Sequence, residues 1–252
     1  MCGRFALTAT PDAVQSMLGV MELDPFPPRY NIAPTQPILM ALSGPSRAPG
    51  SNLPSRSALL VRWGLIPSWA KNPADLPLLF NARSETAAQK ASFKTAMRHR
   101  RALVPASGFY EWRRVGNKRA EPYWIRPRHG GVIAFAGLME SWSEPGGTEM
   151  DTGAILTTEA NARLKGIHHR MPVVIEPQDF ERWLDCLNQE PRHVADLLKP
   201  AEPDFFEAIP VSDKVNKVAN AGPELQDRAE RPADAITAEK KSSDKDDQLT
   251  LF

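Results

Sequence analysis

The sequence predicts an α+β protein: a single domain with a curved, barrel-like antiparallel β-sheet flanked by helices. Short apolar runs bounded by Gly, Pro or polar turn residues dominate the middle of the chain, and such runs are typical of strands. Proline accounts for 24 of 252 residues, nearly twice the background of ~5%, which disfavours a helical bundle. Helix-like spacing is confined to short stretches around these runs, so the two element types mix within one domain.

The first expected element is a helix over DAVQSML, with Thr10 as its N-cap and Pro11 at its first position. The strands expected after it cover residues 58–64, 102–105, 109–113, 122–126, 132–139, 153–158 and 173–175. Gly116-Asn117 is expected to close one hairpin and Gly130-Gly131 a second.

Three further helices are expected. Residues 83–97 are rich in alanine and contain a capping-box pattern from Thr86 to Gln89. Residues 177–187 and 191–198 also have helix-like spacing, with Phe180, Trp183, Leu184 and Leu187 on one face. We see no internal repeat.

The composition excludes several classes of protein. No apolar run approaches the ~20 residues of a membrane helix, and the N-terminus lacks the long apolar region of a signal peptide. We therefore expect a soluble, cytoplasmic protein. Two cysteines, Cys2 and Cys186, are too few for a disulfide framework or a four-thiolate zinc site.

The charge is unevenly distributed along the chain. Residues 224–252 hold eight acidic and five basic residues, a net charge of −3, and have few aromatic or β-branched residues. Residues 1–223 hold 26 basic and 22 acidic residues, a net charge of +4, although the whole chain carries only +1. We therefore expect a mildly basic domain over 2–223 and a disordered tail over 224–252.

Cys2 is the most informative candidate residue. A small second residue permits removal of Met1, so the mature chain would start with cysteine. That N-terminus places an α-amine (pKa ~7.7–8.0) beside a thiol (pKa ~8.5). The neutral amine can form a Schiff base with an aldehyde, and the thiol can then close a thiazolidine ring. On position alone a buried structural cysteine is the alternative, and we expect Cys186, in the run ERWLDCL, to be one.

Asn81 and Glu111 are candidates on different grounds. Asn81 lies in FNARSET, where an amide and a guanidinium can face an anion, or where the asparagine can be an ordinary helix cap. Glu111 lies in GFYEWR, and strand alternation places it on one face with Phe109 and Arg113. Aromatic neighbours would desolvate its carboxyl, raise its pKa and suit it to proton transfer. The alternative is a surface glutamate paired with Arg113.

His168 lies in GIHHRMP, two residues before Arg170. Histidine exchanges protons near neutral pH, and arginine binds phosphate. Adjacent histidines can also bind a metal, but no cluster of cysteines or acids supports a metal site, and we expect no cofactor. Arginines interleaved with aromatics, as in Arg62-Trp63, would suit phosphate binding with base stacking, although a solvated helix end explains RHRR equally well.

Eight short motifs occur in fixed order: MCGRF, RYNIAPTQ, WGLIPSWA, FNARSET, GFYEW, ILTT, GIHHRMPVV and PVSDKVNKVANAGPEL. With them the chain closely resembles the SOS-response-associated peptidase (SRAP) family, which captures abasic sites in single-stranded DNA. The resemblance spans about residues 2–223. It implies the SRAP fold, a single α+β domain with a barrel-like sheet and a positively charged DNA channel.

The resemblance also implies roles for individual residues. The family's nucleophile maps onto Cys2 after removal of Met1, and its active-site asparagine, glutamate and histidine map onto Asn81, Glu111 and His168. The remaining implied positions are DNA or active-site contacts at Arg4, Arg83, Thr157 and Arg170, and a base-wedging loop at Trp69. Some members have two adjacent tryptophans in that loop, whereas this chain has Trp69-Ala70, so base stacking should depend on Trp69 alone.

The function expected from this resemblance is binding of single-stranded DNA and a covalent thiazolidine crosslink between Cys2 and an abasic site, which shields the site in the DNA damage response. The Schiff-base stage would also permit weak lyase activity. Two alternatives stay open: a cysteine peptidase that acts on itself, to remove Met1 or to release the bound protein, and a non-covalent single-strand binder. We expect a monomer, associated with the nucleoid at replication forks and not with a membrane.

The tail ends in Gln248-Leu249-Thr250-Leu251-Phe252, an apolar cluster after a polar stretch. This end resembles the QLxLF-type peptide with which bacterial proteins bind the replication sliding clamp. Gln248 would bind at the rim of the clamp pocket, with Leu249 beside it, while Leu251 and Phe252 would fill the apolar part. The alternative is a chance hydrophobic chain end.

Overall fold

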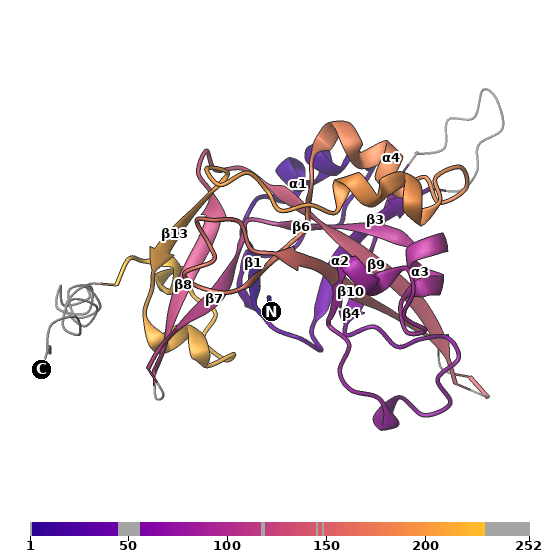
Figure 1. The fold of residues 1–252 in the computed structure, drawn as a ribbon, viewed down its shortest axis with the longest axis horizontal. Coiled ribbons are helices and arrows are strands. Elements are labelled where there is room, and N and C mark those ends of the chain that lie inside the picture. Colours follow the sequence, from indigo (N-terminus) through magenta and orange to yellow (C-terminus); the bar gives the residue numbers. More distant parts are fainter. Residues whose placement is uncertain (1, 45–55, 117–118, 145, 148, 230–252) are drawn as a thin grey trace, which may run out of the picture.

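The structure, a computed structural model, describes residues 2–44, 56–116, 119–144, 146–147 and 149–229. Its smaller sheet is antiparallel, with strand order β13-β8-β7-β1-β2 (Figure 1). The strands are β1 (Phe5–Leu7), β2 (Arg29–Ile32), β7 (Gly108–Val115), β8 (Arg119–Pro127) and β13 (Phe206–Pro210).

The larger sheet closes on itself into a five-stranded barrel, because β10 pairs with both β4 and β9. Around the ring the strands are β10 (Glu149–Glu159), β4 (Arg56–Trp63), β3 (Pro37–Ser43), β6 (Arg101–Ala106) and β9 (Ile133–Ser143). Three short strands extend it: β5 (Asn81–Arg83), β11 (Arg170–Pro172) and β12 (Val174–Ile175). The expected α+β fold with a barrel-like sheet is confirmed, but the barrel is mixed, since β10 runs parallel to β4 and β5.

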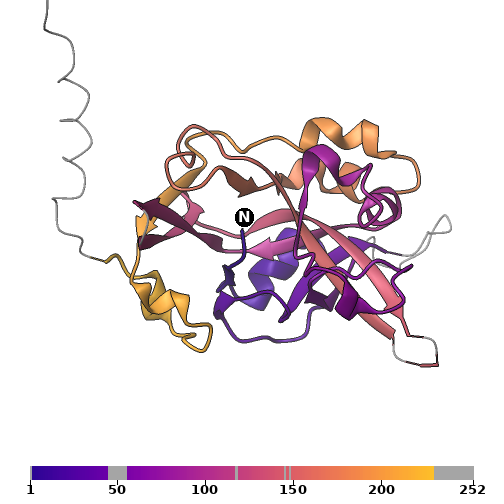
Figure 2. The same cartoon turned by 60° about the horizontal axis from the view of Figure 1, so that its bottom comes forward.

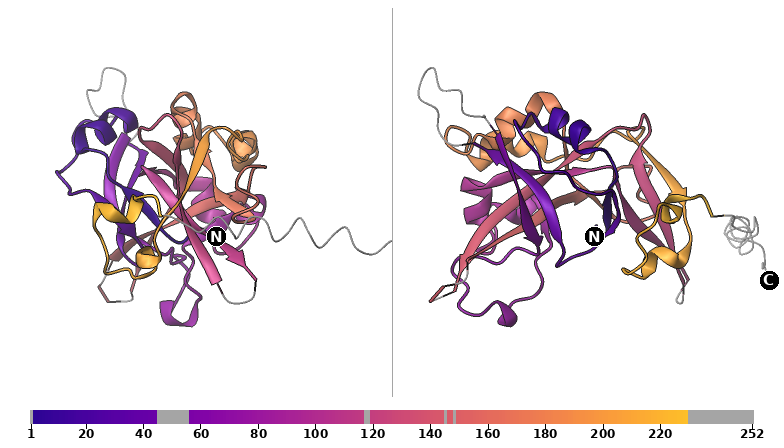
Figure 3. Two further views of the ribbon diagram at one scale, coloured as in Figure 1. Left: turned by 90° about the vertical axis from the view of Figure 1, so that its left-hand side faces the viewer. Right: turned by 180° about the vertical axis from the view of Figure 1, so that it is seen from behind.

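The α-helices are short and lie outside the sheets (Figures 1 and 3). They are α1 (Pro11–Leu18), α2 (Ser84–Ala87), α3 (Lys94–His99) and α4 (Phe180–Leu184), with 3₁₀ turns η1 (Pro73–Asp75), η2 (Pro177–Asp179), η3 (Pro191–Leu197), η4 (Asp213–Asn216) and η5 (Pro223–Gln226). Helix α1 begins as expected, with Thr10 Oγ1 accepting from the Ala13 N–H.

The single helix expected over 83–97 is wrong. Residues 81–83 form strand β5 against β10, and the rest divides into α2 and α3, separated by turns. Phe93, at the start of α3, is buried and has a non-helical backbone, while the turn before it is largely exposed. Sheet pairing and burial of Phe93 thus override the helix propensity of the alanines.

The helix expected over 177–187 is also shorter. Phe180, Trp183 and Leu184 are buried as expected, but the helix ends at Leu184 and Leu187 is exposed. The Asp185 carboxylate accepts hydrogen bonds from the backbone N–H groups of Leu187 and Asn188, which replaces a further helical turn.

Gly116 does lie between two paired strands, with Val115 opposite Arg119. Gly130-Gly131, in contrast, closes no hairpin, because β8 and β9 belong to different sheets and the chain crosses from one to the other there. Glycine suits both places because it tolerates positive φ, at 59° for Gly116 and 70° for Gly130.

The interior of the barrel is narrow, and one methionine fills much of it. A Cβ added to Gly153 on β10 would lie 2.3 Å from Met40 Cε, and one on Gly137 of β9 would lie 3.0 Å from Val104 Cγ2. Met40 itself is fully buried. The two glycines therefore make room for the packed core that fixes the barrel strands.

The packed part of the chain continues past residue 223, where we expected the domain to end. Leu225, in η5, is fully buried, and Ala229 donates to the Pro210 carbonyl. Residues 230–252, with the expected clamp peptide, lie outside the described residues. Among the residues that are described, no helix is long and apolar enough to cross a membrane.

Candidate active site

The N-terminal residues lie at the centre of the molecule, between the two sheets (Figure 2). Phe5 pairs with Phe109 of β7, and the Tyr110 N–H donates to the Arg4 carbonyl at 2.9 Å. This register directs the residues before β1 along β7 towards Glu111. Cys2 is consequently fully buried, although it is almost at the end of the chain.

Asn81 holds Cys2 in place. Its Nδ2 donates to the Cys2 carbonyl at 2.8 Å. The asparagine stands at the start of β5, opposite Ile155 of β10, so the barrel fixes its backbone. Its Oδ1 is buried and accepts no hydrogen bond from any residue that the structure describes. An orphaned acceptor beside the first residues of the chain is suited to receive an N–H or O–H of a ligand.

Glu111 is a buried carboxyl, 3% exposed. Burial raises its pKa to about 7, so that acid and base forms are both populated at neutral pH. The alternative of a surface glutamate is wrong because of this burial, and Arg113 forms a salt bridge with Glu121, with 2.7 Å between Nη2 and Oε2. The desolvation expected for this carboxyl agrees with its burial, and its part in proton transfer stays a prediction.

The His168 ring lies next to that carboxyl, with 3.6 Å between His168 Nδ1 and Glu111 Oε1. The backbone N–H of Arg170 donates to the same Nδ1 at 3.0 Å, so the proton of the neutral ring is assigned to Nε2. Burial, above all, lowers the pKa of His168 to about 4. Both shifts favour the uncharged forms, a neutral imidazole for His168 and a protonated carboxyl for Glu111.

The Cys2 thiol remains protonated in this environment. Burial first, and the Glu111 carboxylate second, raise its pKa well above the ordinary value. Its Sγ lies 3.8 Å from the Arg4 carbonyl oxygen. A thiolate, which a cysteine peptidase needs as its nucleophile, is strongly disfavoured here.

The other expected contact residues divide into two groups. Trp69 is 54% exposed, with its Nε1 donating to the Ala91 carbonyl, and Arg83 is exposed beside Asn81. Thr157 and Arg170 are buried, at 0% and 8% exposure, and Arg170 contacts the His168 ring through its backbone N–H and Thr157 through its guanidinium. Trp69 and Arg83 can thus reach a large ligand directly, whereas Thr157 and Arg170 are placed to support the site.

Arg4 is half-buried and ties the site to the C-terminal part of the domain. Its Nη1 donates to Asn31 Oδ1 at 2.7 Å and to the Val215 carbonyl at 2.8 Å. Asn31 Nδ2 in turn donates to the carbonyls of Val215, Lys217 and Asn220. The sequence reasoning assigned no role to Asn31, although the residue stands inside the motif RYNIAPTQ.

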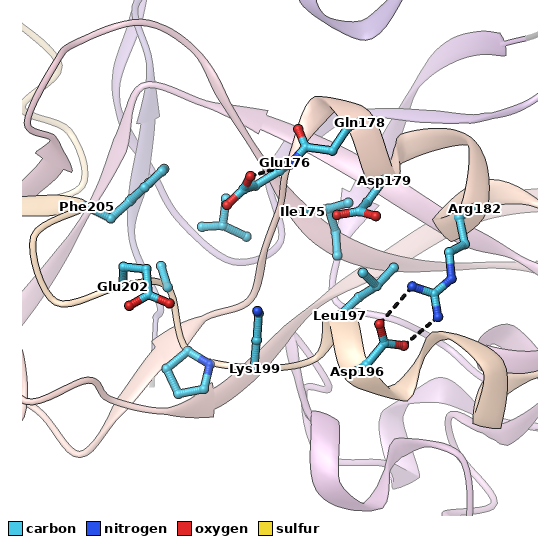
Figure 4. A pocket seen from close by; sticks show the side chains of 13 residues that line it. Ile175, Glu176, Gln178, Asp179, Arg182, Asp196, Leu197, Lys199, Glu202 and Phe205 are labelled. Carbon is cyan, nitrogen blue, oxygen red and sulfur yellow. Dashed lines mark hydrogen bonds and ion pairs between the residues drawn. The ribbon is translucent and has the colours of Figure 1, made fainter.

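A pocket of about 240 Å³ lies elsewhere, between β12, η2, α4 and η3 (Figure 4). Arg182, on its wall, is paired with both carboxylate oxygens of Asp196, and none of the residues assigned above to the site lines it. The described residues contain no group of three His, Cys, Asp or Glu side chains that could hold a metal ion.

A family model described as "SOS response associated peptidase (SRAP)" matches residues 1–218. The chain is 38% identical to "Abasic site processing protein YoqW" of Bacillus subtilis, over 89% of this chain and 98% of that protein. It is 38% identical to YoaM of the same organism, over 90% and 98% of the two chains, and 32% identical to chicken (Gallus gallus) HMCES, over 79% and 66%. Both are also named abasic site processing proteins.

Solved structures agree on the fold. A crystal structure of a protein from Bacteroides thetaiotaomicron superposes with a TM-score of 0.79 at 24% identity, over 90% of this chain and all of that one. A protein from Bordetella bronchiseptica superposes with a TM-score of 0.70 at 22% identity, over 84% of this chain and all of that one.

Proposed function

Because the chain belongs to the SOS response associated peptidase (SRAP) family, several of whose members are named abasic site processing proteins, we propose that it processes abasic sites in DNA through a covalent bond to Cys2. The observation that carries this proposal is the burial of Cys2 beside Asn81, in a site that also holds Glu111 and His168. Asn81 Nδ2 donates to the Cys2 carbonyl, burial and then the Glu111 carboxylate raise the pKa of the Cys2 thiol, and His168 adjoins Glu111.

The reaction starts after removal of Met1. An abasic deoxyribose exchanges between a closed hemiacetal and an open aldehyde, and His168, as the neutral Nε2–H form, assists ring opening by a proton transfer at the sugar oxygen. The neutral α-amine of Cys2 attacks C1′ and forms a carbinolamine. Loss of water needs a proton on the departing hydroxyl, and the acid form of Glu111 supplies it, leaving a Schiff base.

The thiol completes the reaction. The Cys2 S–H adds across the C=N bond, so that sulfur bonds to C1′ and the proton ends on nitrogen, giving a thiazolidine with no change of oxidation state. A protonated thiol suits this order, because the amine has to react first. The Schiff-base stage also allows weak strand scission.

We propose that two exposed residues bind the DNA: Trp69 stacks on a base and Arg83 holds a phosphate. Arg4 lies half-buried next to Cys2, and its guanidinium carbon is 5.9 Å from the Trp112 ring centre. It is therefore proposed to order the N-terminus as well as to contact the strand. A single-stranded substrate gives access that a duplex would deny to a buried nucleophile.

The test is incubation with a single-stranded oligonucleotide that carries one abasic site, followed by intact-mass measurement. We expect the mass of the chain without Met1, plus the oligonucleotide, minus one water. Cys2→Ala should form no stable adduct, and an adduct at the wild-type level would refute the proposal. Turnover of peptides without DNA would favour the peptidase instead, and equal affinity for intact DNA without an adduct would favour the plain single-strand binder.

A second proposal concerns the C-terminal residues 248–252, which lie outside the described part of the chain. We retain the proposal that this peptide binds the bacterial sliding clamp and tethers the domain near replicating DNA. Deletion of 248–252 should abolish clamp binding in a pull-down with purified clamp and leave adduct formation unchanged. Unchanged clamp affinity would refute it.

A further inference from the structure

Arg170 is a buried cation with a dedicated partner. Its Nη1 donates to Glu85 Oε1 at 2.7 Å and its Nη2 to Glu85 Oε2 at 2.9 Å. Nη2 also donates to the Thr157 carbonyl. The Arg170 guanidinium, in return, holds the pKa of the Glu85 carboxyl below its ordinary value. Bidentate pairs fix geometry as well as charge, and Glu85, whose side chain is 46% exposed, covers the buried guanidinium from the solvent side, so the orientation of the Arg170 side chain depends on Glu85.

The backbone of the same arginine holds the histidine ring. The Arg170 N–H donates to His168 Nδ1 at 3.0 Å, closer than the 3.2 Å between Nδ1 and the Arg170 carbonyl oxygen, and so favours the Nε2–H tautomer of the ring. Arg170 is also the first residue of β11, opposite Glu159 of β10. Movement of the Arg170 side chain would therefore shift the donor on which the orientation of His168 relies.

The ion pair joins two parts of the site that are distant in sequence. Glu85 lies in the first turn of α2, directly after the strand that begins with Asn81. Thr157 of β10 pairs with Arg83 of β5 on one side and with Pro172 of β11 on the other, so β10 lies between the segment of Glu85 and the segment of Arg170. One carboxylate thus links the segment that holds Cys2 to the segment that holds the imidazole.

We propose that Glu85 is a positioning residue of the site: through its ion pair with Arg170 it keeps the His168 ring in the Nε2–H tautomer and next to Glu111, in register with Asn81. The inference rests on the proposed function, since it concerns the same reaction. Glu85 touches neither the sugar nor Cys2 in this scheme, and acts through Arg170.

The experiment compares Glu85→Gln with the matched control Glu207→Gln, which also removes one carboxylate from an arginine pair. Glu207 binds Arg126 at 2.7 Å, and the pair links β13 to β8, with no contact to His168 among the interactions of the described residues. Adduct formation is followed in single turnover at saturating abasic DNA over pH 5–9. Affinity is measured separately with DNA that carries a tetrahydrofuran analogue, which lacks the aldehyde.

For Glu85→Gln we expect the saturating rate constant to fall by about tenfold or more, within the range for a misplaced proton-transfer group, while the dissociation constant of the analogue changes less than twofold. We expect Glu85→Asp, which keeps the charge, to recover part of the rate. Glu111 lies 3.6 Å from the His168 ring, the His169 ring packs against it, and Arg114 acts on it electrostatically. Glu85→Gln changes none of these groups. A shift of the acid limb of the pH–rate profile to higher pH would therefore indicate that water has gained access to His168.

A second measurement does not depend on the reaction. Long-range ¹H–¹⁵N spectra of the histidine rings should show His168 as the Nε2–H tautomer in wild type and in Glu207→Gln, and a tautomer mixture with a raised pKa in Glu85→Gln. Wild-type rate, pH profile and spectra in Glu85→Gln would overturn the inference. So would a loss of DNA affinity with an unchanged saturating rate. Absence of any adduct in wild type would refute the proposed function alone, since the spectra would still test the position of His168.

Discussion

Glu111→Gln should separate the chemistry of the site from the stability of the fold. Glutamine has the size of the protonated acid and cannot donate or take up a proton in catalysis. General acid–base catalysis contributes about 10²–10⁴-fold, so the rate of adduct formation should fall by about 10²-fold or more. The amine of Cys2, with a pKa of ~7.7–8.0, makes the wild-type rate rise with pH, and ionisation of Glu111 makes it fall again above about 7. The variant should lose the falling limb and keep the rising one.

The same substitution should stabilise the protein at high pH. Raising the pKa of Glu111 from 4.5 to about 7 corresponds to about 3 kcal/mol between the two protonation states. The folded-state pKa is the higher one, so this stability is fully present below 4.5 and is lost as pH rises through 7. The free energy of unfolding of Glu111→Gln, taken relative to that of wild type, should therefore be about 3 kcal/mol higher at pH 8 than at pH 4.5. Urea unfolding at the two pH values measures it.

The pKa of His168 is lowered, not raised, so the destabilising effect of its burial on the charged form appears as pH falls from 6.5 towards 4, where the fold loses stability. This effect of His168 is present in both proteins and cancels in the difference between them.

Glu140→Gln is the control, because Glu140 on β9 is also buried with a raised pKa but lies beside Arg100. It should leave the rate unchanged. A falling limb that persists in Glu111→Gln, or a stability difference that does not grow with pH, would refute this reasoning.

Three further substitutions test other parts of the structure. Trp69→Ala should weaken binding of single-stranded DNA by about 1–3 kcal/mol in a fluorescence anisotropy titration, with the adduct yield at saturating DNA unchanged; unaltered affinity would remove the tryptophan from the DNA interface. Gly153→Ala should destabilise the barrel by about 1–3 kcal/mol in thermal unfolding, because the new Cβ meets Met40, and an unaltered midpoint would show that Met40 can move aside. Arg101→Met should cost about 3 kcal/mol or more, because four carbonyls lose their donor, two of them buried (Met97 and Trp183) and two part-buried. Urea unfolding measures the loss, and a smaller loss would show that water replaces the guanidinium.

Local pattern was enough for several features of this chain. Thr10 and Pro11 identify α1, because capping depends on adjacent residues alone. The aromatic residues next to Glu111 in GFYEWR indicated a desolvated carboxyl, and Glu111 is buried in β7. Short apolar runs with turn residues between them indicated strands, since a strand of this kind is recognised over about five residues.

Long-range pairing decided the rest. The sequence predicted a helix that starts at Arg83, yet β10 pairs with residues 81–83 as a strand, and that pairing brings the Asn81 amide to the Cys2 carbonyl. Nothing local indicates that Glu85 meets Arg170, 85 residues further on, or that Asn31 binds the carbonyls of residues 215–220. By itself the sequence determined which side chains have the chemistry, because functional groups are read one residue at a time. Only the tertiary structure decided which of them meet and which lose their water, because both depend on strands that close a barrel across the whole chain.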